Sequence, residues 1–247
     1  LLPSTTVERS HPQFSPDGKE LAFIEDRNRL MVLNLETKKV RRITDGSTWY
    51  STSGGFDYAW SPDSKWFTLE FIGNKHDPYS DIGLVSAQGN GEIINLTNSG
   101  YSSGSPSFAL DGNAILFTTE RYGMRAHASW GSLDDAMLVF LNQDAYDKFS
   151  LSKEDYELYK EANSDRKKVA AKDSSKVKDV VVELKNIEDR IVRLTPNSSN
   201  MGSTLISKDG KTLYYLASTE SGRNLWKMDL NKKETKLLHK VDAGWTS

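Results

Sequence analysis

One segment of the sequence has the spacing of a serine nucleophile. Residues Gly100-Tyr101-Ser102-Ser103-Gly104 match G-x-S-x-G, a pattern in which a strained turn presents a serine for attack on an ester or amide. That turn must follow a strand and precede a helix. Here strand-like residues flank the segment on both sides, so we interpret it as a loop between strands. Hydrolysis by Ser102 is kept as an alternative hypothesis.

A second segment could bind a partner. Residues 121–131 form a long polar and aromatic loop between two expected strands. Long loops on rigid scaffolds often bind partners. Its candidate recognition residues are Arg121, Arg125, His127 and Trp130. The alternative is a loop that only packs over its own sheet.

The residue types and their spacing do not indicate a metal or cofactor site. The sequence has no cysteine, and its four histidines lie far apart, without a histidine or carboxylate at the helical spacing of metal-binding motifs. A glycine-rich phosphate loop is also absent from the sequence. We therefore predict no catalytic residue, no cofactor and no metal in this chain.

Composition places the chain among globular proteins, because 37% of its 247 residues are hydrophobic and 27% are charged. The formal net charge of -2 gives no attraction to nucleic acid or acidic membranes. The longest apolar run, Ala136–Leu141, is far shorter than the roughly 20 residues of a membrane span. The start has neither Met nor a signal sequence, so we expect a segment of a longer protein.

A tight turn recurs four times. In the first copy, Ser15-Pro16-Asp17-Gly18-Lys19, proline fixes φ, aspartate can bond its own backbone and glycine accepts a positive φ. Each copy precedes a run of β-branched and aromatic residues that is typical of a strand. We interpret the turn residues as structural; they are Asp17, Gly18, Asp63, Asp111, Gly112, Asp209 and Gly210.

Each turn is the corner of a hairpin, and a third and a fourth strand follow that hairpin, so the unit has the four short antiparallel strands of a propeller blade. The turn aspartates lie 46, 48 and 98 residues apart, and the first two intervals fit the roughly 40–50 residues of one blade. We therefore expect an all-β fold, a single β-propeller segment spanning residues 1–247. Its blades are expected at about 11–46, 57–99, 105–196 and 203–240.

The long third interval predicts an insertion at residues 150–179 of the third blade. Two blades would fit the interval, but no strand–turn–strand pattern starts there. Instead Ser152 precedes Asp155 by three residues, an N-cap pattern that predicts a helix. From Ser164 onward, mixed charges with little to bury predict a mobile surface excursion.

About four blades are few for a closed ring, since propellers have roughly four to eight. Incomplete closure leaves strand edges that can pair with another copy or with further blades. We therefore favour a partial ring over a closed four-bladed disc.

The turns and two longer segments resemble a known family. Val139–Glu154 and Ile187–Ser199 flank the charged insertion and, with the turns, resemble the propeller part of tricorn-like serine proteases of the Bacteroidetes type. The turn alone is shared with TolB and prolyl oligopeptidase propellers, which carry PD40-type repeats. The resemblance covers the whole chain. It implies a periplasmic or secreted peptidase whose propeller filters peptides, and whose PDZ module and catalytic domain lie outside this chain.

Three hypotheses follow. In the first, this is a non-catalytic segment that guides peptides or unfolded protein towards the catalytic domain, through channel-facing loops and strand addition at exposed edges. In the second, it is a TolB-like scaffold that docks another protein of the cell envelope. In the third, it is a hydrolase that uses Ser102. The expected partners are peptides, the remaining domains of the parent peptidase and, through open blade edges, a second copy.

Overall fold

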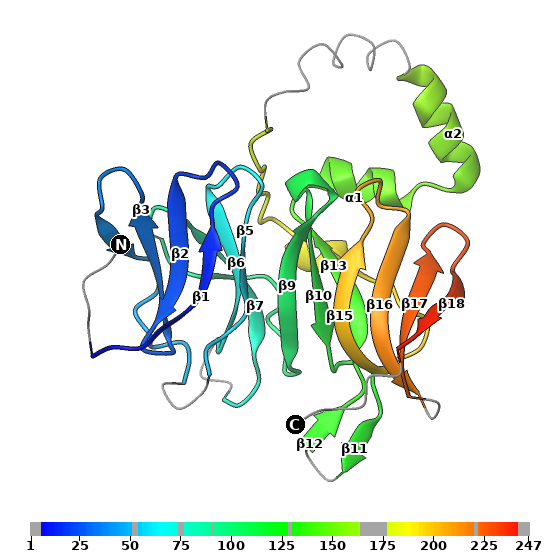
Figure 1. The fold of residues 1–247 in the computed structure, drawn as a ribbon. Coiled ribbons are helices and arrows are strands. Elements are labelled where there is room, and N and C mark those ends of the chain that lie inside the picture. Colours follow the sequence, from blue (N-terminus) through cyan, green and yellow to red (C-terminus); the bar gives the residue numbers. More distant parts are fainter. Residues whose placement is uncertain are drawn as a thin grey trace.

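Four sheets of four antiparallel strands follow one another along the chain and stand side by side in a row (Figure 1). The computed structural model describes residues 6–50, 54–73, 77–89, 91–127, 130–163, 177–219 and 222–241. Within each sheet the strands are ordered as in the sequence. The predicted fold class is therefore confirmed: the chain is all-β, a partial propeller of four blades.

The strand bounds define the blades. The first blade contains β1 (Arg9–Phe14), β2 (Glu20–Glu25), β3 (Arg29–Asn34) and β4 (Val40–Arg42). The second contains β5 (Tyr58–Trp60), β6 (Trp66–Phe71), β7 (Asp81–Ser86) and β8 (Ile94–Asn95). The third contains β9 (Ser103–Ala109), β10 (Ala114–Thr119), β13 (Asp135–Phe140) and β14 (Ile191–Arg193). The fourth contains β15 (Asn200–Ile206), β16 (Thr212–Thr219), β17 (Gly222–Asp229) and β18 (Glu234–Lys240).

Apolar layers between neighbouring sheets form the core. Side chains alternate between the two faces of a strand, so a sheet with a neighbour on each side must be apolar on both faces. In β10, Ile115 and Phe117 pack towards the second blade, whereas Leu116 packs towards the fourth. Strand β13 is buried along its whole length for the same reason.

The third blade carries two additions (Figure 1). Between β10 and β13, strands β11 (Arg125–His127) and β12 (Trp130–Ser132) form a hairpin at one edge of the row of sheets. Between β13 and β14, helices α1 (Gln143–Ser150) and α2 (Lys153–Ala162) lie at the opposite edge. Short 3₁₀ turns occupy Leu110–Gly112 and Ile187–Arg190.

The predicted helical start of the insertion is confirmed. The Ser152 hydroxyl accepts a hydrogen bond from the Asp155 N–H at 3.1 Å, which caps α2. The sequence analysis missed α1, which begins seven residues before the expected boundary and is capped by the Asn142 side chain. The predicted excursion beyond Ser164 falls largely on residues 164–176, outside the described residues.

A serine is the hub of three of the four turns. Ser15, Ser61 and Ser207 donate to the turn aspartate two residues later, at 2.7, 2.5 and 2.6 Å. Each serine oxygen also accepts the N–H of the first residue of the next strand, at 2.9 Å. The serine hydrogen bond is the main cause that lowers the pKa of Asp17 and of Asp209. The turn is therefore closed by a side-chain network as well as by proline and glycine.

The expectation of four copies of one turn is wrong for the third. Ala109 and Leu110 replace the serine and proline, so the hydroxyl hub is missing. The chain instead forms a 3₁₀ turn with positive φ at Leu110, Asp111 and Gly112. The Asn113 side chain donates to the Leu110 carbonyl at 2.7 Å and stabilises this alternative.

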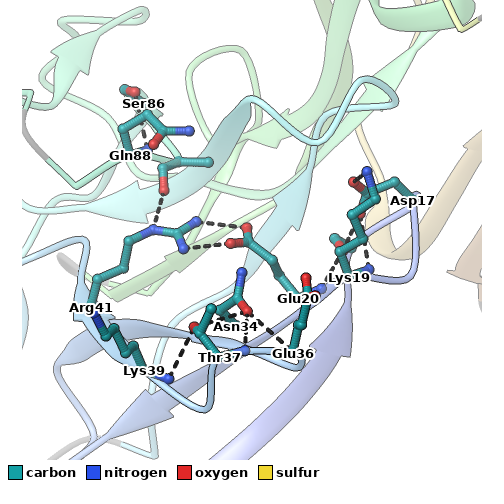
Figure 2. Close-up of polar contacts among 12 residues, drawn as sticks. Asp17, Lys19, Glu20, Asn34, Glu36, Thr37, Lys39, Arg41, Ser86 and Gln88 are labelled. Carbon is teal, nitrogen blue, oxygen red and sulfur yellow. Dashed lines mark hydrogen bonds and ion pairs between the residues drawn. The ribbon is translucent and has the colours of Figure 1, made fainter.

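An arginine fork fastens the first blade to the second. Arg41 of β4 donates to both carboxylate oxygens of Glu20, at 2.5 and 2.6 Å, as Figure 2 shows. Its Nε donates to the carbonyl of Ala87 in the second blade at 2.8 Å. Bidentate pairs of this kind fix geometry as well as charge. The outer strand of the first blade is thus tied to its neighbour by polar contacts.

The serine hub makes a testable prediction for stability. Ser61 is fully buried, and Ser61→Ala leaves the N–H groups of Lys65 and Trp66 without their hydroxyl acceptor. We expect a loss of about 1–3 kcal/mol in the free energy of unfolding, measured by urea denaturation. Ser207→Ala is the matched control, because Ser207 is half-buried and water can replace the hydroxyl. Equal losses of unfolding free energy in the two variants would show that burial of the serine does not decide how much it stabilises the turn.

Candidate functional site

The first strands of the four blades converge on one polar groove. Its volume is about 270 Å³. We call it the inner-strand groove. It is lined by His11 and Gln13 from β1, Phe56, Asp57 and Tyr58 at the start of β5, Ser105, Pro106 and Ser107 from β9, and Ser203 and Thr204 from β15.

The groove is built from one position of the repeat. His11, Asp57, Ser105 and Ser203 each lie six residues before a turn aspartate. In β1, β9 and β15 the strand register shifts at this position, which marks a β-bulge. Bulges redirect side chains and are frequent beside functional sites. In three blades this bulge directs a polar side chain to the groove, His11, Ser105 or Ser203, whereas Asp57 holds the same position just before the regular strand β5.

A glutamate bridges two blades beneath the groove. Glu70 of β6 accepts the N–H of Ser105 in the third blade at 2.7 Å and the N–H of Asp57 at 3.3 Å. Burial raises the pKa of Glu70 to about 7, although the Ser105 hydrogen bond acts in the opposite direction. The neighbouring Asp57 charge adds to the rise. The bulge of β9 is thus held by a carboxyl group that titrates near neutral pH.

Gly104 makes this contact sterically feasible. A Cβ atom at Gly104 would lie 2.5 Å from Glu70 Oε1, closer than real Cβ atoms come. Gly100, the other glycine of the G-x-S-x-G pattern, has open space around it. A side chain at position 104 would therefore displace the Glu70 carboxylate from its present place.

Ser102 lies in a connection between strands. The segment links β8 to β9, and β9 begins at Ser103, so no helix follows the serine. The Ser102 carbonyl accepts the N–H of Glu120 at 3.0 Å. Within the described part of the chain, the Ser102 hydroxyl has no hydrogen-bond partner. The geometry is that of the predicted loop and differs from the strand–turn–helix of a nucleophile elbow.

The turn residues lie apart from the inner-strand groove but contact one another. The Asp17 N–H donates to the Ser64 hydroxyl at 3.3 Å, which links the first turn to the second. A Cβ at Gly112 would meet Pro62 of the second turn, and one at Gly210 would meet Leu110 of the third. The four turns therefore form a packed row, each touching the next.

The structure places the predicted recognition loop away from the inner-strand groove, whose lining contains none of its residues. Arg121 and Arg125 are exposed. His127 and Trp130 are partners in the backbone register of the β11–β12 hairpin. Among the other histidines, His11 lines the groove and His76 lies outside the described residues. In the described ranges, no three His, Asp, Glu or Cys side chains group as a metal site requires.

Sequence reasoning missed Glu70 and the bulge residues. Two signals could have found them. Glu70 is a lone acid within the apolar strand Trp66–Phe71. The residues at this position share the fixed spacing of six from the turn aspartates, although only the third and fourth blades have the same residue type there, a serine.

No family model matches the chain. It is 27% identical over 184 residues to a tricorn-like protease C-terminal subunit of Sulfurisphaera tokodaii, covering 72% of this chain and 18% of that protein. It is also 27% identical over 221 residues to the uncharacterized peptidase YuxL of Bacillus subtilis, covering 86% of this chain and 30% of that protein. The chain thus spans less than a third of the length of these curated relatives.

Solved structures share the fold. The tricorn protease matches with a TM-score of 0.63 at 12% identity, over 94% of this chain and 22% of that chain. TolB from Agrobacterium tumefaciens matches with a TM-score of 0.60 at 15% identity, over 97% and 65%. The chain is a propeller segment that resembles tricorn and TolB. In such a propeller segment, the inner-strand groove lies where the first strands of successive blades meet.

The Glu70 contact predicts a pH dependence. The folded-state pKa of about 7 lies above the ordinary value of 4.5, so the folded protein binds this proton more tightly than the unfolded chain. The stability contributed by the protonated form is complete below about pH 4.5 and is lost as the pH rises towards 7. Wild-type protein should therefore lose more stability between pH 5 and 8 than Glu70→Gln, as measured by urea unfolding at both pH values.

A second measurement localises the effect. The amide resonance of Ser105 should shift with a midpoint near pH 7 in the wild-type protein and remain constant in Glu70→Gln. Identical pH profiles for the two proteins would show that the Glu70 carboxyl does not titrate at this contact.

The two glycines of the G-x-S-x-G pattern offer a matched pair. Gly104→Ala should push the Glu70 carboxylate away from the Ser105 N–H and lower the free energy of unfolding by about 1–3 kcal/mol. Gly100→Ala should change it by less than about 0.5 kcal/mol, because nothing lies within 4 Å of the added atom. Thermal or urea unfolding checks both, and the reverse order would contradict the packing role of Gly104.

Proposed function

We propose that this chain is a non-catalytic propeller segment of a peptidase-related protein. In this proposal the inner-strand groove binds peptides or unfolded polypeptide and guides them towards a catalytic domain outside these 247 residues. The observation that carries the proposal is the convergence of polar side chains from all four blades on one groove. The similarity to a tricorn-like protease subunit and to a peptidase supports the peptidase connection.

The chemistry of the groove suits a polypeptide ligand of variable sequence. The side chains of Gln13, Ser105 and Ser203 are neutral donors and acceptors, and Asp57 and His11 add a carboxylate and an imidazole. Bulges leave backbone groups outside the regular ladder, where an extended chain can add hydrogen bonds. The volume of about 270 Å³ suits a short stretch of chain. Binding of this kind selects an extended backbone more than particular side chains.

The proposed location is the periplasm or the extracellular space. It rests on the resemblance to tricorn-like and TolB-like proteins. None of the described helices has the length and apolar character of a membrane span. The other proposed partners are the remaining domains of the parent protein and a second copy that meets open sheet edges.

A TolB-like docking scaffold is the second candidate function. It is favoured by one observation: the chain corresponds to 65% of the length of TolB from Agrobacterium tumefaciens but to only 22% of the tricorn protease chain. A scaffold would bind a folded envelope protein and leave peptide turnover unaffected. Recovery of such a partner, together with unchanged peptide hydrolysis in groove variants, would favour this candidate.

Obstruction of the groove tests the peptide-guiding function. In the full-length protein, Ser203→Trp should fill the groove, because Ser203 is exposed and lines it. We expect kcat/KM for an unfolded protein substrate to fall about tenfold, equivalent to about 1.4 kcal/mol. Hydrolysis of a short chromogenic peptide should change little. Glu36→Trp, at an exposed turn outside the groove, is the control.

Loss of activity on both substrates alike would argue against a groove that guides unfolded polypeptide.

A separate variant, Ser102→Ala, tests the hydrolase hypothesis. We expect its peptidase activity to equal that of the wild type, because the serine lies in a loop between strands. Abolished hydrolysis in Ser102→Ala, with normal unfolding, would assign catalysis to this chain.

A further inference from the structure

An exposed group of arginine, tyrosine and methionine side chains lies around the loop that connects β10 to the β11–β12 hairpin. Met124 is 77% exposed, Tyr122 46% and Tyr101 38%. We call the set Tyr101, Arg121, Tyr122, Met124 and Arg125 the arginine–tyrosine surface. Its residues do not line the inner-strand groove, so it is a separate feature of the molecule.

The surface is anchored to a buried carboxylate. Asp135, at the start of β13, is fully buried and accepts hydrogen bonds from Arg193 Nε at 3.0 Å and Nη2 at 2.9 Å. The hydroxyls of Thr195 and Ser198 also donate to Asp135, each at 2.7 Å. The guanidinium of Arg193 is therefore fixed in position, and its face lies 4.9 Å from the centre of the Tyr122 ring.

The other two arginines of the surface also make cation–π contacts with tyrosine rings. The Arg121 guanidinium lies 5.6 Å from the Tyr122 ring, so Tyr122 contacts two arginines. Arg125 lies 6.0 Å from the ring of Tyr101, which belongs to the loop before β9. Such cation–π contacts orient a guanidinium without neutralising its charge. Among the described residues, Arg121 and Arg125 form no ion pair.

The loop itself is held by close backbone packing. A Cβ at Gly123 would lie 1.7 Å from the carbonyl oxygen of Leu133, so only glycine allows this approach. The Leu133 N–H donates to the Met124 carbonyl at 3.2 Å. A surface whose side chains and backbone are ordered before binding loses less entropy when a partner docks.

Three acidic residues interact with one another next to this surface, and all three are buried or half-buried. Asp135 is fully buried, whereas Glu120 and Asp134 are half-buried. Burial raises the pKa of Asp134 to about 6, and the charges of Glu120 and Asp135 contribute to the rise. The charged groups that face outward are Arg121 and Arg125, both exposed. The outer layer of this surface is therefore positive.

We propose that the arginine–tyrosine surface binds an acidic, partly apolar stretch of polypeptide. Carboxylates of the partner pair with Arg121 and Arg125, and an apolar side chain packs on Met124 and the tyrosine rings. Arginine, tyrosine and methionine are the residue types enriched at the centres of protein interfaces. Two unpaired guanidinium groups on a chain of net charge -2 are too few to neutralise a run of phosphates, which favours a polypeptide over a nucleic acid.

The experiment uses the full-length protein and a fluorescein-labelled peptide of alternating Glu and Leu, with binding followed by fluorescence anisotropy. The variant Arg121→Glu/Arg125→Glu should weaken binding at least about tenfold. The control Lys39→Glu/Lys232→Glu has the same change in net charge at two exposed sites and should stay within about twofold of wild type. Tyr122→Ala should also weaken binding, whereas Tyr122→Phe, which keeps the ring, should not.

Three results would overturn the proposal. They are equal binding by wild type and the arginine variant, equal binding of a peptide with Gln in place of Glu, and equally tight binding of an oligothymidylate of the same charge. If the charge reversal lowers the unfolding midpoint, Arg121→Gln/Arg125→Gln replaces it, with the same outcome expected.

Discussion

Burial of both faces of each interior sheet is the constraint on which this structure depends. A sheet in a stack cannot follow the usual alternation of apolar and polar residues, because neither of its faces meets water. Strands such as β10 and β13 meet this demand with nearly continuous apolar sequence. The consequence is a scaffold in which each blade is stabilised by its neighbours, as in other repeat architectures.

Two aspartates that enter this scaffold are held by hydrogen-bond networks. Asp81 and Asp135, which begin the third strands of their blades, are fully buried and each accepts a hydrogen bond from a threonine that follows the fourth strand by two residues, at 2.7 Å in both blades. Glu70 differs from both, because among the described residues only backbone N–H groups donate to its carboxyl group, those of Asp57 and Ser105. An unpaired carboxyl of this kind favours its protonated form when it is desolvated. Two residues that line the inner-strand groove, Asp57 and Ser105, therefore donate to a carboxyl group that burial shifts towards its protonated form.

The sequence was informative where a local rule decides the structure. The turns, the strands that follow them and the Ser152 cap could all be predicted, because proline, glycine and capping side chains act over a few residues. The third turn could not, since Ala109-Leu110-Asp111-Gly112 keeps the aspartate and glycine but lacks the serine on which the network depends. Helix α1 was missed because it is only eight residues long and its Asn142 cap follows directly on an apolar run, so no long helical pattern marks it. The Glu70 contact joins residues 35 positions apart in two blades, and no local pattern encodes such a pairing.

Both proposed binding surfaces lie outside the apolar layers, one at bulges that recur in the first strands and one at a loop that the third blade adds. A bulge adds a residue to an inner strand without disturbing the apolar layers, because the second and third strands of the blade keep their register. The β11–β12 hairpin adds a whole loop at a connection that is only a few residues long in the first blade. Residues within the packed layers cannot change freely, since each is in contact with a neighbouring blade. Substitutions at the inner-strand bulges and in the loops at the sheet edges avoid these contacts, so a binding surface can be built at these two places without changing the core.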